Sequence, residues 1–282
     1  MRNRILAGVG IAALATVGIA APASAATPST ADLYVVHGVP GEGDFPVDVY
    51  ANGAPVASLQ DIKFSTVTTE PLALPPGAYN IDIFPGAAVD GTGEPVLTLD
   101  ATLAAGDSFT VVAHLKANGD PTITAFKNNV GAIAAGQARL TVRHTAAAGQ
   151  VDVLAAGAPL APFVKVANPT GADADVPAGP VSAAVAATGT TAALIGPADL
   201  PLAAGTNTMV HAIGSLDDDN LAFAVITIAD LGASPHGIPA GSAGLVAESG
   251  MSGWAAAGVA LFLAALAALG IVVRRQTVSA GR

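Results

Sequence analysis

Residues 33–57 read LYVVHGVPGEGDFPVDVYANGAPVA, and residues 140–161 read LTVRHTAAAGQVDVLAAGAPLA. Both stretches begin with a predicted strand that ends in a histidine, then contain a Val-Asp-Val triplet and a Gly-Ala-Pro segment. A second shared segment, Leu-Ala-Ala-Gly, stands at residues 103–106 and 202–205. Self-similarity at one long period indicates a duplicated structural unit. The sequence therefore predicts two tandem domains, residues 26–133 and residues 134–231.

Within each copy, apolar and polar residues alternate. Tyr79, Ile81 and Ile83 alternate with Asn80 and Asp82. The same period of two covers residues 97–103 and 108–115, where Thr110 and His114 take polar positions. This period is typical of half-buried strands, and turn formers such as Asn52-Gly53 separate the runs. We predict an all-β fold of two immunoglobulin-like antiparallel β-sandwiches, each with roughly seven strands.

The second copy is degenerate in its apolar positions. Residues 177–187 read PAGPVSAAVAA where the first copy has PGAYNIDI over residues 76–83. Small side chains replace the tyrosine and isoleucines of the first copy, and a smaller side chain buries less apolar surface. We therefore expect a thinner core and lower stability in the second domain.

The two ends of the chain have the pattern of targeting segments. Residues 1–25 predict a signal peptide with two arginines, an apolar run and a small-x-small cleavage site between Ala25 and Ala26. Residues 254–273 are uncharged and end at two arginines, which predicts a transmembrane helix. Residues 232–253 form a Gly, Ala, Ser and Pro-rich stalk, and residues 274–282 a cytoplasmic tail. This order predicts a single-pass cell-membrane protein of type I topology, attached through its C-terminal helix.

The charge of the chain bears on its partners. The chain has 11 basic and 21 acidic residues and a formal charge of -10. Six of the basic residues and all of the acidic ones lie between the two end segments, which gives this portion a charge of about −15. Nucleic acid is excluded as a partner because phosphate binding needs a positive surface. The absence of cysteine excludes disulfides, thiolate metal sites and cysteine catalysis.

A histidine and an aspartate that recur in both copies are the candidate site residues. His37 and His144 end their apolar runs, and Asp48 and Asp152 follow them in the Val-Asp-Val triplets. Because both copies have the same pair, we favour a structural role in which these side chains bind loop backbone groups. A ligand or metal role and a catalytic role are the alternatives. No zinc-protease, Gly-x-Ser-x-Gly or Walker-type motif is present, so we predict no catalytic residue, no metal and no cofactor.

An acidic cluster stands at Asp217-Asp218-Asp219. Oxygen ligands in a tight loop suit a divalent cation such as Ca²⁺, but the spacing of an EF-hand loop is missing. We interpret the cluster as a solvated turn, with a cation site as the alternative.

Several of these motifs together resemble a known family. The stretch from Leu33 to His37 and Pro40, followed by Val47-Asp48-Val49-Tyr50, is similar to the bacterial family called domain of unknown function 4397. The resemblance implies exported, often tandem, β-sandwich domains without an assigned activity. In the second copy Pro40 has no counterpart and Leu154 replaces Tyr50.

The architecture favours one class of function over the others. We expect a non-enzymatic cell-surface protein that acts as a binding or adhesion module for an envelope protein or glycan. A structural spacer without a specific ligand is the alternative, and an envelope hydrolase is a third hypothesis. A binding module would show an exposed strand edge or an apolar patch.

Overall fold

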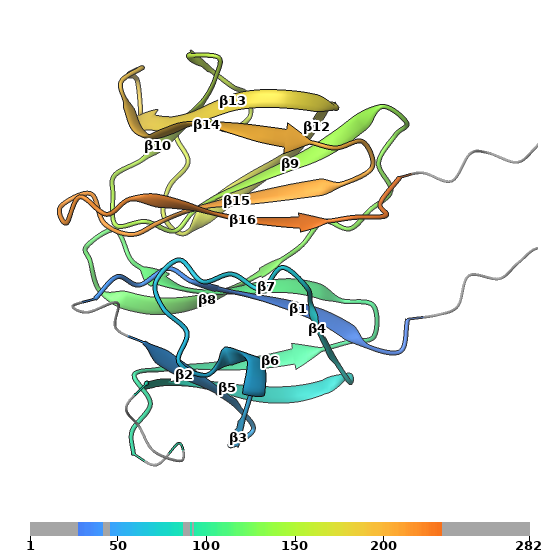
Figure 1. Cartoon of the computed structure of the whole chain (residues 1–282), viewed down its shortest axis with the longest axis vertical. Coiled ribbons are helices and arrows are strands. Elements are labelled where there is room, and N and C mark those ends of the chain that lie inside the picture. Colours follow the sequence, from blue (N-terminus) through green and yellow to red (C-terminus); the bar gives the residue numbers. More distant parts are fainter. Residues whose placement is uncertain (1–27, 42–45, 87–90, 92, 233–282) are drawn as a thin grey trace, which may run out of the picture. The chain divides into compact units, whose positions relative to one another are not determined.

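Sixteen strands and one short 3-10 helix make up the described part of the chain (Figure 1). The computed structural model describes residues 28–41, 46–86, 91 and 93–232. The strands are β1 (Ala31–His37), β2 (Val47–Ala51), β3 (Ala54–Pro55), β4 (Leu72–Leu74), β5 (Gly77–Pro85), β6 (Leu97–Leu103), β7 (Ser108–Leu115), β8 (Pro121–Lys127), β9 (Gln137–His144), β10 (Val151–Ala155), β11 (Ala158–Pro159), β12 (Thr170–Pro177), β13 (Gly179–Ala187), β14 (Ala193–Leu202), β15 (Asn207–Ile213) and β16 (Ala222–Ile228), and the 3-10 helix η2 covers Ala57–Leu59.

The predicted targeting segments lie outside the described residues. This holds for the signal peptide, the transmembrane helix, the cytoplasmic tail and all of the stalk except residue 232. Within the described ranges, no helix has the length and apolar character needed to cross a bilayer.

The strands form four sheets of four strands each. β4-β1-β7-β8 and β3-β2-β5-β6 make up what we name the first sandwich, and β12-β9-β15-β16 and β11-β10-β13-β14 make up the second sandwich. The strand order of the first sandwich recurs in the second, with each strand number raised by eight. The all-β sandwich fold predicted from the period of two is thus confirmed, with eight described strands in each sandwich instead of roughly seven.

The prediction that all strands are antiparallel was wrong for two of the sheets. β1 pairs with β7 in parallel, and β9 pairs with β15 in parallel. After β1, the chain crosses to the other sheet of the sandwich and returns as β7 in the same direction. Parallel neighbours need such a long crossover, and the side-chain period does not depend on strand direction.

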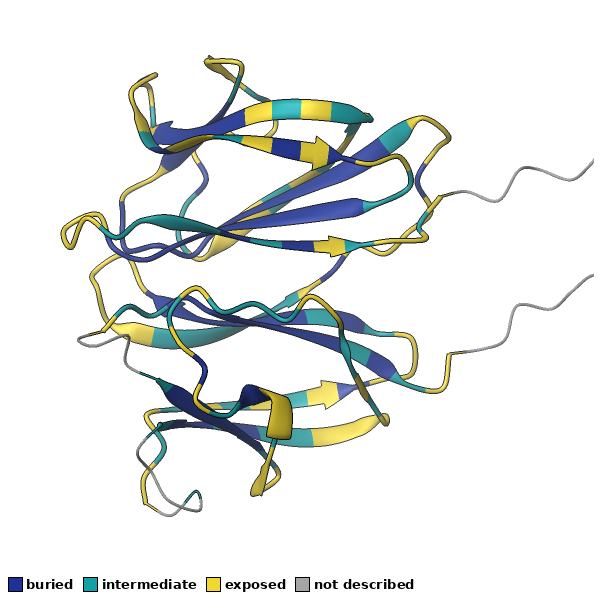
Figure 2. Cartoon of the chain, viewed as in Figure 1, coloured by how far each residue is buried: buried dark blue, intermediate teal, exposed yellow. Residues whose placement is uncertain are grey.

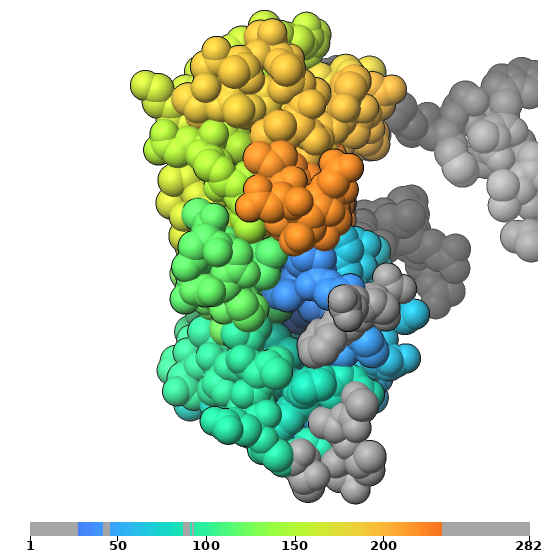
Figure 3. Space-filling model, turned by 90° about the vertical axis from the view of Figure 1, so that its left-hand side faces the viewer, coloured from blue at the N-terminus to red at the C-terminus, as the bar shows by residue number. Residues whose placement is uncertain are grey.

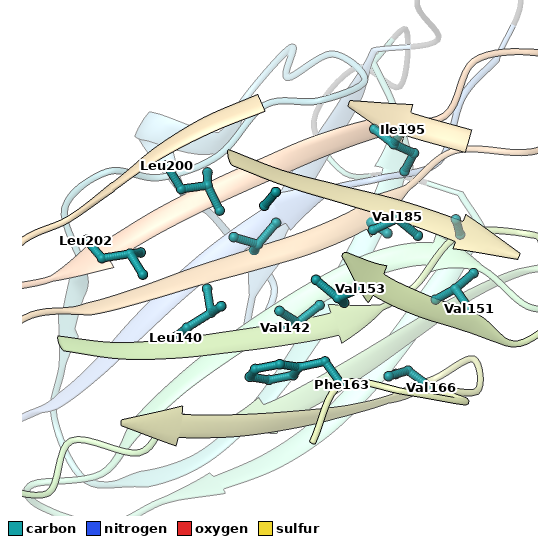
Figure 4. Close-up of a cluster of buried hydrophobic side chains, with 14 of the residues drawn as sticks. Leu140, Val142, Val151, Val153, Phe163, Val166, Val185, Ile195, Leu200 and Leu202 are labelled. Carbon is teal, nitrogen blue, oxygen red and sulfur yellow. The ribbon is translucent and has the colours of Figure 1, made fainter. Parts of the chain in front are cut away.

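Each sandwich has its own apolar core between its two sheets. Val49, Leu59 and Ile81 belong to the core of the first sandwich. The core of the second sandwich surrounds Phe163, which is fully buried (Figure 4). Phe163 takes the place of Leu59: the backbone N–H of each donates to the carbonyl three residues earlier, and each precedes an equivalent bridge to β2 or β10.

The core of the second sandwich is not thinner than that of the first, contrary to what the sequence had led us to expect. Ala183 and Val185 replace Ile81 and Ile83, but Phe163 in the place of Leu59 adds a buried ring to the same core (Figure 4). An apolar cavity of about 80 Å³ lies between the sheets of the first sandwich, whereas two apolar spaces in the second sandwich measure about 10 Å³ each. A side chain from the loop between β11 and β12 thus offsets volume that is lost on β13, and a comparison of one strand at a time misses this.

A third apolar cluster joins the two sandwiches. It is made up of Tyr34, Val36, Val112, Met209, Ile213, Ala224 and Ile226, from β1 and β7 on one side and β15 and β16 on the other. We name the two sheet faces that meet here the shared interface. Strands on both sides of it are dark blue in Figure 2, and Figure 3 shows the chain of the second sandwich directly against that of the first.

The shared interface changes the description of β7 and of the domains. Thr110 and His114, predicted on the solvent side of a half-buried strand, are both fully buried, because a third sheet covers that face. The described residues from 28 to 231 form one compact unit that includes both sandwiches. The boundary between residues 133 and 134 stays a prediction.

Gly38 permits the close approach of the two sandwiches, and its replacement tests the shared interface. A Cβ at this position would lie 2.7 Å from Cγ2 of Ile213 and 3.1 Å from the carbonyl oxygen of Ala113. We expect Gly38→Ala to lower the free energy of unfolding of residues 26–231 by about 1 to 3 kcal/mol in urea denaturation. Gly149→Ala is the matched control, since a Cβ there meets nothing within 4 Å. Equal stability of the two variants would contradict this account of the interface.

Candidate functional site

His37 and His144 end β1 and β9, and both are buried with 1% of their surface exposed. The backbone N–H of His37 donates to the carbonyl of Thr66, and its own carbonyl accepts from Ser65. His144 donates from Nε2 to the carbonyl oxygen of Gly149 at 2.9 Å. Burial lowers the pKa of His144 and keeps its ring neutral. A side chain held in this way is not available to a substrate in solution.

Asp48 and Asp152 bind backbone groups of the loop that follows β3 or β11. Asp48 accepts the N–H of Asp61 at 2.6 Å, and Asp152 accepts the N–H of Lys165 at 2.7 Å through the same oxygen, Oδ1. Asp152 also accepts the N–H of Gly189 at 2.8 Å through Oδ2. These hydrogen bonds, with that of Gly189 the strongest, lower the pKa of Asp152. The two carboxylates are committed to loop backbone in both copies.

Pro40 and Tyr50 lie apart from these loop contacts. Pro40 is half-buried beyond the end of β1. Tyr50 is buried on the outer face of its sheet, where its ring meets that of Phe84 edge to face at a centroid distance of 5.2 Å. In the second sandwich Leu154 packs with two alanines at this place, so the aromatic pair belongs to the first copy. The six predicted site residues are therefore distributed over two sandwiches and do not form one site.

The carboxylate of Asp152 provides a direct test of the structural role. In Asp152→Asn one loop N–H faces an amide NH₂ group instead of an oxygen, so we expect the melting temperature of residues 26–231 to fall by about 5 °C at pH 7. The lowered pKa means that this stabilisation is present above pH 4 and is lost as the pH falls through the folded-state pKa. The difference from the unmodified protein should therefore shrink at pH 3.

Asp199→Asn is the control for this experiment, because Asp199 is exposed on β14 of the same sheet. A loss of stability in Asp152→Asn that did not exceed the loss in Asp199→Asn would argue against the loop contact.

A buried polar cluster at the shared interface was missed by the sequence analysis. Arg143 of β9 is 4% exposed, and its guanidinium carbon lies 4.8 Å from the ring centroid of Phe126. Its Nη2 donates to Oδ1 of Asn128 at 2.9 Å and to the carbonyl of Lys127. Burial lowers the pKa of Arg143 to about 10, so the side chain stays charged at neutral pH. Arg143 thus joins the second sandwich to the end of β8.

His211 accepts a hydrogen bond from the same guanidinium. Nη1 of Arg143 lies 3.2 Å from Nε2 of His211, and because arginine has only donors, this nitrogen is unprotonated. Burial, followed by the charge of Arg143, lowers the pKa of His211 to about 3. His114 of β7 is also buried, with hydrogen bonds to Thr124 and to its neighbouring carbonyl, and burial lowers its pKa. These histidines stay neutral inside the protein.

The neutral state of His211 predicts how stability depends on pH. Above pH 6.5 His211 is neutral in both the folded and the unfolded chain, and its contribution does not change. Below pH 6.5 only the unfolded chain takes up the proton, so the free energy of unfolding should fall by about 1.4 kcal/mol per pH unit from this residue alone. Urea denaturation at pH 7, 6 and 5 measures this slope.

His211→Gln is the comparison for that slope, since the amide oxygen can still accept from Arg143 but does not titrate. We expect the slope of His211→Gln to be smaller by about one proton. Identical slopes for both proteins would show that His211 does not remain neutral in the folded state.

Asp217, Asp218 and Asp219 form an exposed turn between β15 and β16. The turn is held by the backbone N–H of Ser215, which donates to Oδ1 of Asn220, and by the N–H of Asp218, which donates to the hydroxyl of Ser215. Among the residues that the structure describes, no group of three or more His, Cys, Asp or Glu side chains is placed to hold a metal ion.

The comparison with protein families agrees with the motifs of the first sandwich. Residues 31–154 match the family model described as Domain of unknown function (DUF4397). These residues are similar to the DUF4397 family. The resemblance predicted from the His, Pro and Val-Asp-Val-Tyr motifs is therefore confirmed there. The DUF4397 match runs from the first residue of β1 into β10, so it continues past the predicted domain boundary. A search of curated proteins found no match.

Proposed function

We propose that the chain is a non-enzymatic cell-surface protein that binds a component of the bacterial envelope. The proposal includes an immunoglobulin-like arrangement of the sandwiches, a signal peptide over residues 1–25 and a transmembrane helix over residues 254–273. The negative charge between the end segments is compatible with an envelope protein or a neutral glycan as partner and not with nucleic acid.

A non-enzymatic role is supported by the hydrogen bonds and the burial of the candidate catalytic side chains. His144, Asp48 and Asp152 bind backbone groups of their own loops, and His114 and His211 lie inside the shared interface. A general acid or base has to reach the substrate within hydrogen-bond distance. Groups that already hold the fold together are poor candidates for that work.

The asymmetry between the two sandwiches favours a binding module over a spacer. Both sandwiches have the same topology, but the first has an apolar cavity of about 80 Å³, where the second is filled by Phe163. Such a cavity costs about 2 kcal/mol of stability. A spacer needs stability alone and gains nothing from the cavity, whereas a binding protein can use one.

Co-sedimentation with purified insoluble envelope material tests this proposal. We expect residues 26–231 to bind in a saturable manner and to release no soluble fragments from the material. Saturable binding without cleavage supports the binding module, and binding that does not exceed that to an inert polymer leaves the spacer. Release of fragments that depends on the protein would establish an enzyme.

The isolated first sandwich is unsuitable as a control for this experiment. Its separation from the second sandwich would expose Tyr34, Val36 and Val112, which are buried in the shared interface, and such an apolar face adsorbs to many surfaces. Gly149→Ala, in which the new methyl group meets nothing within 4 Å, serves as the reference for intact protein.

A further inference from the structure

The interior of the first sandwich has an apolar cavity that continues toward the surface. The inner part, about 80 Å³, lies between the two sheets and is lined by side chains that include Val49, Leu59 and Ile81. The outer part, about 190 Å³, is lined by Val39, Val96, Leu97 and Pro121, among others. His37, Val47, Ile83 and Ala113 line both parts. The two parts are therefore adjacent, and Val96, 49% exposed, lies on the outer one.

The equivalent space in the second sandwich is closed. His144, Ala146, Leu194 and Leu221 occupy the places of His37, Val39, Val96 and Pro121, and they enclose only about 10 Å³. Leu221 replaces a proline at the outer part, and Phe163 replaces Leu59 at the inner part. Two substitutions to larger side chains thus close in the second copy what the first copy leaves open.

The lining determines what kind of molecule the cavity can accept. Nearly all lining side chains are Val, Leu, Ile or Ala. The described lining has no Asp, Glu, Lys or Arg, and its polar side chains are those of His37 and Tyr79. The hydroxyl of Tyr79 donates to the carbonyl of Pro75 and is engaged there. A cavity of this character does not attract water, which needs polar partners, but takes up apolar molecules. Its size is below that of pockets for drug-sized ligands, so one narrow group fits.

We propose that the first sandwich binds a single neutral aliphatic chain, which enters past Val39, Val96 and Pro121 and ends beside Leu59. The polar end of the ligand stays at the surface, where the excess of carboxylates disfavours an anionic head group. This proposal deepens the binding function and rests on it for its biological meaning. The aliphatic chain of the ligand can belong to a membrane lipid or to a free aliphatic molecule.

Methyl NMR titration of residues 26–231 with n-octanol tests the proposal. We expect saturable shifts confined to the methyl groups of the cavity, such as those of Val49, Leu59 and Ile81. Octanoate should bind at least threefold more weakly than octanol. Vesicles of phosphatidylcholine form the second arm: shifts of the same methyl groups identify a lipid chain as ligand, and shifts with octanol alone identify a free aliphatic molecule.

Three variants locate the site. Leu59→Phe introduces the ring that fills the second sandwich and should weaken octanol binding at least tenfold while the melting temperature is retained. Val96→Lys places a charge at the outer part and should weaken binding to a similar extent. Leu216→Lys is the matched control, because Leu216 is 44% exposed in the second sandwich, and it should bind as the unmodified protein does.

Two results would overturn the proposal. One is the absence of saturable shifts with octanol, and the other is unchanged affinity in Val96→Lys, an exposed position where the variant should fold even if Leu59→Phe does not. Neither result bears on co-sedimentation with envelope material, so failure of the aliphatic site and failure of the envelope-binding function can be told apart.

Discussion

The two sandwiches pack against each other through one sheet of each, and this contact determines which side chains are buried throughout the protein. β1 and β7 are covered on one side by their own sandwich and on the other by β15 and β16. Their side chains are therefore buried on both faces, and polar groups on the covered face need internal partners. Arg143 donates hydrogen bonds to His211 and Asn128. His114 forms hydrogen bonds with Thr124 and with the carbonyl of Leu115. The apolar cluster contributes hydrophobic stabilisation, while this polar cluster specifies how the two faces meet.

Divergence between the two copies made this contact possible. By register, Val36 and Val112 of the first copy correspond to Arg143 and His211 of the second, and Thr110 and His114 correspond to Met209 and Ile213. Apolar positions in one copy are thus polar in the other. Met209 and Ile213 meet Val36 and Val112 in the apolar cluster. The sequence repeat explains why both sandwiches have the same topology. The positions at which the two copies differ explain how the sandwiches pack against each other.

Differences between the two copies also give the two sandwiches different interiors. Leu59 and Pro121 leave space in the first sandwich, while Phe163 and Leu221 fill it in the second. The aspartates shared by the copies bind backbone groups of their loops, and the residues that differ give the first copy its cavity. In this protein the duplicated features support the fold, and the features that were not duplicated are the candidates for binding.

The all-β class, the duplication and the DUF4397 resemblance could be predicted from the sequence, because side-chain alternation, turn residues and local motifs are properties of short stretches. The sequence also determined which aspartates recur, although not that they bind Asp61 and Lys165 across a loop. The folded protein was needed to find the parallel pairing of β1 with β7, the burial of Thr110 and His114, and the buried ring that Phe163 adds to a core with small residues on β13. These features depend on which face meets which partner. Residues far apart in the chain share that information, and no local pattern contains it.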